Sequence, residues 1–141
     1  MINTENITFK HRLDIQIRMT DLDPFQHVNN GILCAYFDLG RLQYMKDIVG
    51  YLSLSELDMV LVHTEFDYLH SIRFHDEIAV ETTITGIGEK SVKMLQRIVS
   101  KDNSTTYCLC YSVLSGYDRS QDCLKKIDET FKKIIFDFEQ G

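Results

Sequence analysis

The order of hydrophobic patterns along the chain constrains its fold more strongly than any single motif. Residues 12–18 alternate apolar and polar side chains, which predicts a half-buried strand. Apolar residues then recur at helical spacing over residues 30–49, which predicts one long helix. After that helix, runs rich in β-branched and aromatic residues predict four strands, at residues 59–68, 77–87, 91–101 and 105–116. We expect the last three strands to form a meander.

Glycines and a capping residue refine this pattern. Gly50 stands where the C′ glycine of the long helix belongs, and Gly40 in the helix interior predicts a close backbone approach by the sheet. A second, shorter helix is predicted behind Asp128 as N-cap, from the helical spacing of Ile127, Phe131, Ile134, Ile135 and Phe138. The whole order predicts an α+β fold in which an antiparallel sheet wraps around one long central helix, with a short C-terminal helix.

Length and composition limit the number of domains and the kinds of binding partner. A chain of 141 residues with 44% hydrophobic residues fits a single domain over residues 1–141. The net charge of −6 and the lack of a Lys/Arg run argue against nucleic acid or an anionic membrane as the partner. The N-terminal residues are polar and the sequence has no long apolar span, so we expect a soluble cytoplasmic protein.

Residues 21–30, with the sequence DLDPFQHVNN, crowd carboxylates, an imidazole and two carboxamides between the first strand and the long helix. Pro24 biases Asp23 toward an extended conformation, so Asp23 is expected to end the strand, with the helix beginning at Asn29 or Asn30. The carboxylate would then face unpaired helix amides. A carboxylate supplies a nucleophile or general base for acyl transfer, and helix amides stabilise an anionic oxygen.

The pattern D-x-D-x-x-x-H-V-N-N, followed by Tyr36-Phe37-Asp38 and Arg41, resembles the hotdog-fold acyl thioesterases of the 4-hydroxybenzoyl-CoA thioesterase class. The same ten residues are also similar to the plant acyl-carrier-protein thioesterases. This resemblance implies a hotdog fold and the hydrolysis of an acyl-CoA or acyl-carrier thioester. It also implies a homodimer or homotetramer, in which sheets pair edge to edge and build the site between subunits.

The resemblance also implies roles for individual residues. Asp23 would attack the thioester or activate water, the Asn30 amide would polarise the thioester carbonyl, and His27 would orient water or substrate. These three are the predicted catalytic residues. The predicted substrate-binding residues are Phe25, Tyr36, Lys90 and Ser91, with Lys93 and Arg97 as further candidates for a basic surface that coenzyme A requires. No cofactor and no metal is implied.

The chain departs from these families at three places. Gln26 stands where the class usually has glycine, and Tyr68-Leu69-His70-Ser71 lacks the proline of a Tyr-x-x-Pro segment. Phe25 stands where the plant enzymes have an asparagine that takes part in catalysis. The third departure favours a mechanism that depends on the carboxylate alone over the plant-type Asp-Asn-His set.

Each motif residue also has a purely structural interpretation. Asp23 before a proline is typical of a turn, a single histidine such as His27 is often a structural partner, and Asn29 and Asn30 suit helix capping. Tyr36, together with other helix aromatics, is also expected in the core or at a subunit contact.

Other titratable residues have structural interpretations as well. The spacing of Cys34, Cys108, Cys110 and Cys123 favours buried free thiols over a zinc site, with a nucleophilic role for Cys34 as the lesser alternative. Asp38 and Arg41 are expected to form a solvated ion pair. A further group fits no standard metal site: His63, Asp67, His70, His75 and Asp76.

Two other functions remain open from the sequence. A hotdog hydratase or dehydratase would use the same fold, but the chain lacks the hydratase signature. A non-catalytic module would hold an acyl thioester in the same pocket without turnover. The sequence does not decide the acyl group, the carrier, or whether Asp23 acts as nucleophile or general base.

Overall fold

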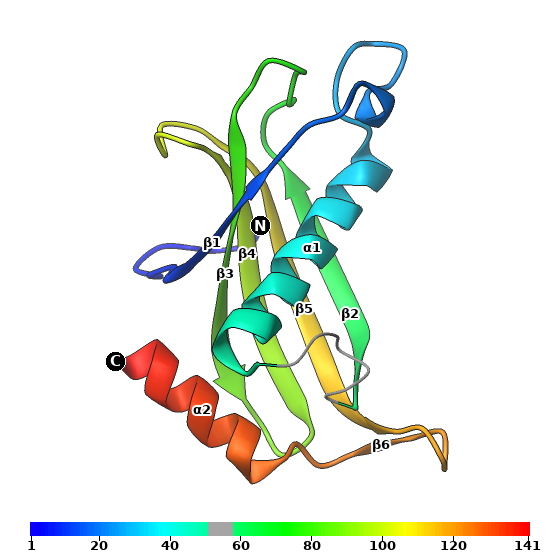
Figure 1. Cartoon of the computed structure of the whole chain (residues 1–141), viewed down its shortest axis with the longest axis vertical. Coiled ribbons are helices and arrows are strands. Elements are labelled where there is room, and N and C mark those ends of the chain that lie inside the picture. Colours follow the sequence, from blue (N-terminus) through cyan, green and yellow to red (C-terminus); the bar gives the residue numbers. More distant parts are fainter. Residues whose placement is uncertain (51–57) are drawn as a thin grey trace.

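The computed structural model describes residues 1–50 and 58–141, and Figure 1 shows how the elements of this part of the chain are arranged. The strands are β1 (His11–Ile15), β2 (Met59–Tyr68), β3 (Ile78–Ile87), β4 (Ser91–Ser100), β5 (Thr106–Asp118) and β6 (Cys123–Lys125). The helices are α1 (Asn30–Ile48), α2 (Glu129–Gln140) and the short 3-10 helix η1 (Met19–Asp21).

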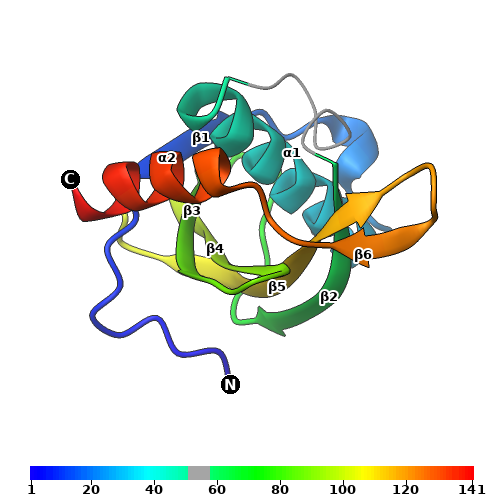
Figure 2. The same ribbon diagram turned by 90° about the horizontal axis from the view of Figure 1, so that it is seen from below.

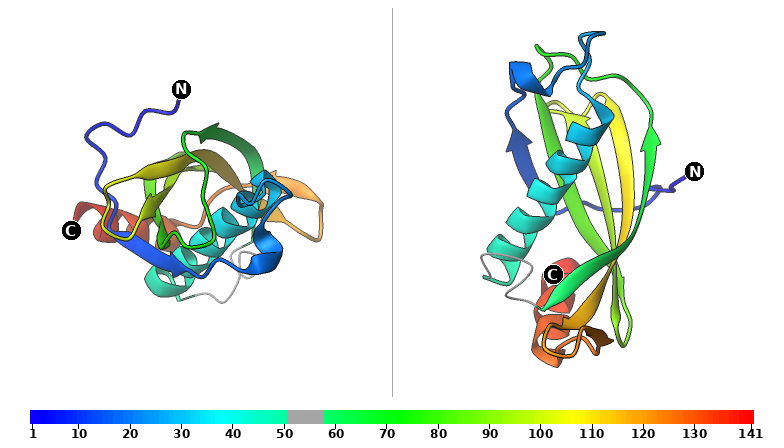
Figure 3. Two further views of the ribbon diagram at one scale, coloured as in Figure 1. Left: turned by 90° about the horizontal axis from the view of Figure 1, so that it is seen from above. Right: turned by 90° about the vertical axis from the view of Figure 1, so that its right-hand side faces the viewer.

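The strands form one antiparallel sheet in the order β1-β3-β4-β5-β2, with β6 paired to the end of β5. The sheet curves around α1, which crosses its inner face diagonally (Figure 3). The helix α2 lies on the same side of the sheet as α1, whereas the N-terminal residues run along the opposite face (Figure 2). The predicted α+β hotdog fold and the meander β3-β4-β5 are therefore confirmed.

Two elements differ from the sequence prediction. The first strand ends at Ile15 instead of residue 18, because residues 19–21 turn into η1, so Asp23 does not end that strand. The strand β6 was not predicted, because it has only three residues and Cys123 and Leu124 are exposed. Short exposed strands lack the alternation from which longer strands are recognised.

Both ends of α1 agree with the sequence prediction. Asn29 is the N-cap, and its side chain accepts a hydrogen bond from the Gly31 amide. Gly50 has φ +88°, and its amide donates to the carbonyls of Met45 and Lys46, as expected of a C′ glycine.

Gly40 lies where α1 touches the sheet. A Cβ at this position would stand 2.6 Å from Val80 Cγ1 and 2.9 Å from Gln96 Nε2, so the sheet leaves no room for a side chain. This confirms the close approach that an interior helix glycine predicts.

Two hydrophobic clusters lie along α1, one near each end, and buried polar side chains lie between them. The Gln96 amide donates to the Phe37 carbonyl and to Thr82 Oγ1, both at 3.0 Å, and accepts from Arg41 Nη1 at 2.9 Å. Arg41 also pairs with Asp38. Because Arg41 is only 3% exposed, the prediction of a solvated Asp38–Arg41 pair is wrong for the guanidinium.

All four cysteines are free, but only two are fully buried. Burial raises the pKa of Cys108 to about 12 and that of Cys110 to about 11, so both thiols stay protonated at neutral pH. Cys34 is partly exposed and Cys123 is exposed, so the prediction of buried thiols is wrong for these two.

The helix α2 begins behind Asp128, which caps the Thr130 amide at 2.7 Å, as predicted. Its buried residues Phe131 and Ile135 belong to the cluster near the C-terminal end of α1. In the part of the chain that the structure describes, no helix is both long enough and apolar enough to span a membrane.

Candidate active site

Residues 21–29 form a closed loop, here called the site loop, between η1 and α1. The Asp21 carbonyl accepts the Asn29 amide at 2.9 Å, the His27 carbonyl accepts the Asp23 amide at 2.8 Å, and the Asp23 carbonyl accepts the Gln26 amide at 3.0 Å. Gln26 has φ +69°, which explains why related families favour glycine at this position. The loop therefore has a defined conformation.

Only one oxygen of the Asp23 carboxylate accepts hydrogen bonds from the site loop. Asp23 Oδ1 accepts the amides of Phe25 at 2.9 Å and His27 at 3.2 Å, which is the turn role that an Asp-Pro sequence suggests. Within the described residues, Asp23 Oδ2 accepts no hydrogen bond. The turn thus orients the side chain through one of its two oxygens.

This side chain lines a cavity of about 320 Å³. The walls come from the site loop, the first turn of α1 and the segment that follows β2, which meet at one end of the molecule (Figure 3). The Val28 amide donates to the Ile72 carbonyl at 2.8 Å and joins two of these walls. The lining residues are Asp23, His27, Val28, Asn30, Leu33, Tyr68, Leu69, His70, Ser71 and Ile72.

The first turn of α1, which borders this cavity through Asn30, contains an amide without a hydrogen-bond partner in the described residues. The Asn29 side chain takes the Gly31 amide at 2.7 Å, whereas no acceptor for the Asn30 amide is found among residues 1–50 and 58–141. Unpaired amides at a helix N-terminus carry partial positive charge and attract anions. Asn30 therefore contributes a hydrogen-bond donor through its backbone.

One chain brings together only part of the predicted site. Asp23, His27 and Asn30 line the same cavity, but Phe25 is 80% exposed and does not line it. Tyr36 is buried, and its hydroxyl donates to Asp21 Oδ2 at 2.6 Å. Burial and this bond raise the pKa of Tyr36. The catalytic and binding roles of all these residues remain predictions.

Lys90 is the last residue of the β3–β4 turn and Ser91 is the first residue of β4, at the opposite end of the sheet from the site loop (Figure 1). The Lys90 carbonyl is tied to the Gly116 amide at 3.0 Å, and the Ser91 carbonyl accepts the Gly88 amide at 2.7 Å. Within one chain, these two residues are therefore separated from Asp23 by the length of the sheet.

Three cavity residues, Tyr68, His70 and Ser71, were not predicted as site residues. The only sequence feature that pointed to them was the segment Tyr68-Leu69-His70-Ser71, which stands where related families have Tyr-x-x-Pro. It was noted only because it lacks the proline. The Tyr68 ring stacks on Phe66 with centroids 6.1 Å apart, and burial is the main reason that the pKa of Tyr68 is raised. His70 had been considered only as a possible metal ligand.

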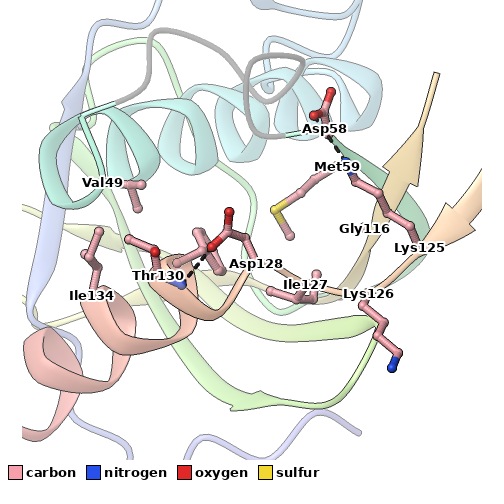
Figure 4. A pocket seen from close by; sticks show the side chains of 11 residues that line it. Val49, Asp58, Met59, Gly116, Lys125, Lys126, Ile127, Asp128, Thr130 and Ile134 are labelled. Carbon is pink, nitrogen blue, oxygen red and sulfur yellow. Dashed lines mark hydrogen bonds and ion pairs between the residues drawn. The ribbon is translucent and has the colours of Figure 1, made fainter. Parts of the chain in front are cut away.

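A second cavity, of about 290 Å³, lies at the other end of the molecule between α2, β6 and the start of β2 (Figure 4). Its charged side chains have partners. Lys125 pairs with Asp58 at 3.3 Å, and Asp128 caps α2. No group of three or more His, Cys, Asp or Glu side chains that could hold a metal is found in the described residues.

An antiparallel sheet wrapped around one long helix, with a short C-terminal helix, is the architecture of a hotdog fold. The sequence profile of the thioesterase-like superfamily matches residues 17–135. The chain belongs to this superfamily, which supports thioester hydrolysis as its general reaction. No curated protein sequence matches the chain.

Solved structures agree with this assignment. A thioesterase from Thermus thermophilus, complexed with coenzyme A and zinc, is 28% identical with a TM-score of 0.83, covering 94% of this chain and 97% of that one. A predicted thioesterase from Bacillus stearothermophilus is 22% identical with a TM-score of 0.80, covering 89% and 93%. A Staphylococcus aureus protein in complex with CoA is 13% identical with a TM-score of 0.82, covering 96% and 88%. The last two show the fold alone.

Proposed function

We propose that this protein hydrolyses an acyl-CoA thioester to a free acid and coenzyme A, with Asp23 as nucleophile or general base. The observation that carries the proposal is the cavity lined by both Asp23 and Asn30, in which two amides orient Asp23 Oδ1 and the Asn30 amide has no partner in the described residues. Coenzyme A is proposed as the carrier because two proteins of similar structure were solved with it.

The reaction needs one carboxylate and one oxyanion donor. Asp23 Oδ2 either attacks the thioester carbonyl, forming an anhydride that water cleaves, or takes a proton from a water that attacks the carbonyl. In both routes the acyl–sulfur bond breaks and the thiolate leaves, to be protonated. The Asn30 amide donates to the oxygen that becomes negative in the tetrahedral intermediate.

Two histidines and two hydroxyl-bearing residues, Tyr68 and Ser71, also line the cavity. His27 lies on the site loop, and His70 and Ser71 lie on the segment after β2, which is hydrogen-bonded to the loop through Val28 and Ile72. We assign His27 to the orientation of water or of the thioester.

The distance between Lys90 and Asp23 favours a site shared by two copies of the chain. The strand β2 is an edge of the sheet and exposes Leu61 and Val62. Exposed edges invite pairing with another chain. If two β2 strands pair antiparallel about a two-fold axis, the second copy is turned end for end, and its Lys90–Ser91 turn moves toward the first copy's cavity.

The dimer is tested by Val62→Lys, because a lysine on an edge strand opposes pairing. Sedimentation should change from dimer to monomer for this variant. The matched control is Leu124→Lys, which adds the same charge at an exposed apolar residue of β6. A wild type that sediments as a monomer would contradict this part of the proposal.

The reaction is tested by thiol release from a panel of acyl-CoAs. Asp23→Asn should lower turnover by roughly 10²–10⁴-fold with an unchanged circular dichroism spectrum. Asp137→Asn, an exposed carboxylate on α2, should leave turnover unchanged. Tight binding without thiol release by the wild type would identify a binding module, and formation of an enoyl thioester would identify a dehydratase.

A further inference from the structure

Asp21 is a buried carboxylate and the first residue of the site loop, two residues before Asp23. Its side chain is 1% exposed. Its pKa lies below the ordinary value of 3.8: burial, the largest single influence, raises the pKa, but hydrogen bonds from Tyr36 and Arg18 outweigh it. An ionised group in this position persists only when its oxygens are well bonded.

Each polar group of Asp21 has a partner. Oδ2 accepts the Tyr36 hydroxyl at 2.6 Å and the Arg18 amide at 3.0 Å, and Oδ1 accepts Arg18 Nη2 at 3.0 Å. The Asp21 amide donates to the Arg18 carbonyl at 2.9 Å, and its carbonyl accepts the Asn29 amide at 2.9 Å. One residue thus joins η1, the site loop and α1.

These bonds fix both groups that the proposed reaction uses. Asp23 follows Asp21 by two residues, and Asn30 follows Asn29, whose amide Asp21 accepts. Tyr36 lies six residues beyond Asn30 on α1, about 9 Å along the helix axis, where the sheet encloses it. Its hydroxyl therefore ties the start of the loop to the rigid part of the helix.

We propose that Asp21 and the Tyr36 hydroxyl are positioning residues that hold the Asp23 carboxylate opposite the Asn30 amide. This inference rests on the proposed function. Neither group touches substrate, because Asp21 and Tyr36 are 1% and 2% exposed. Tyr36 is thereby assigned to positioning instead of substrate binding, and Asp21 is excluded as the attacking carboxylate.

The test compares Tyr36→Phe with Tyr44→Phe. Tyr44 is a matched control, because it is also buried on α1 and its hydroxyl donates to Glu139 Oε1 at 2.6 Å, remote from the site loop. For Tyr36→Phe we expect kcat to fall roughly 10–100-fold with KM nearly constant, because misplaced catalytic groups cost rate and not binding. For Tyr44→Phe we expect wild-type kcat. Equal kcat values for the two folded variants would overturn the proposal.

Amide hydrogen exchange without substrate separates this proposal from the proposed reaction. Three site-loop amides report on the loop: those of Phe25 and His27 donate to Asp23 Oδ1, and that of Val28 donates to the Ile72 carbonyl. These amides should exchange faster in Tyr36→Phe but not in Tyr44→Phe. Unchanged exchange in Tyr36→Phe would overturn the positioning role. If exchange changes as expected while the wild type releases no thiol, the positioning role stands and the proposed reaction fails.

Discussion

The two ends of α1 use the same hydrogen bond for different purposes. At the N-terminal end, the hydroxyl of buried Tyr36 donates to Asp21 of the site loop, and at the C-terminal end the hydroxyl of buried Tyr44 donates to Glu139 of α2, both at 2.6 Å. The first bond fixes a loop with one free carboxylate oxygen, and the second fixes a packed helix. The comparison shows that the functional importance of a buried hydrogen bond depends on which segment the bond restrains.

The C-terminal end is built for packing alone. Glu139 also accepts Thr83 Oγ1 at 2.8 Å and the Ile84 amide at 3.3 Å, so its carboxylate is bonded to α1 and β3 together. Lys10 Nζ binds three carbonyls at the end of α2. None of these groups takes part in the proposed reaction, so we expect changes here to alter stability and not turnover.

The largest stability effects are expected at the two tyrosines. Tyr36→Phe and Tyr44→Phe each remove a hydrogen bond to a carboxylate, which should lower the free energy of unfolding by about 1.5–3 kcal/mol. Urea titrations at one fixed protein concentration measure both. If one variant loses much of its free energy of unfolding and the other none, the two hydrogen bonds do not contribute equally to stability, which would contradict the comparison.

A substitution at Gly40, between the two ends of α1, should destabilise both ends of the helix equally. Gly40→Ala places a Cβ 2.6 Å from Val80 Cγ1, so the helix must shift from the sheet. We expect a loss of roughly 1–2 kcal/mol, since overpacking outweighs the better helix propensity of alanine. Hydrogen exchange should rise on both sides of residue 40. Increased stability would show that the sheet accommodates the methyl group.

The N-caps of the two helices sharpen the comparison further. Asn29 and Asp128 each cap a helix through a side-chain oxygen at 2.7 Å. Asn29→Ala and Asp128→Ala should each cost about 1 kcal/mol of stability. Only Asn29→Ala should also lower kcat, because it precedes the Asn30 amide. Thermal melts and thiol release on the same samples distinguish the two, and equal kcat values would argue against the Asn30 amide as oxyanion donor.

The smallest expected effect is a dependence of the free energy of unfolding on pH below about pH 4. The pKa of Asp21 in the folded protein lies below 3.8, so its ionised form stabilises the fold above that pH, and this contribution is lost as the pH falls toward the folded pKa. Asp21→Asn should therefore be less stable than the wild type at pH 7, with a smaller difference at pH 3. Unfolding midpoints across this range measure it, and parallel curves would contradict the lowered pKa.

Periodicity was sufficient to predict the architecture. The long helix, its Gly50 end and the four later strands all follow from patterns that span ten or more residues, and these were confirmed. The η1 turn and β6 were missed because each has three residues and no hydrophobic repeat. The burial of Arg41 was also missed, because its partner Gln96 is distant in the sequence and only the fold brings them together.

The site was partly predictable for the same reason. Asp23, His27 and Asn30 are close in the sequence, so one motif indicated them together, and the structure places them around one cavity. Tyr68, His70 and Ser71 reach that cavity from a segment some 40 residues away, which no local pattern reveals. The tie between Tyr36 and Asp21 likewise depends on how η1 packs on the helix.

Thiol release by Asp23→Asn tests the central claim most directly. With an acyl-CoA that the wild type cleaves, the account predicts a loss of turnover of roughly 10²–10⁴-fold in a variant that still folds and still binds the thioester. Turnover by Asp23→Asn equal to that of the wild type and of Asp137→Asn would contradict the assignment of this carboxylate.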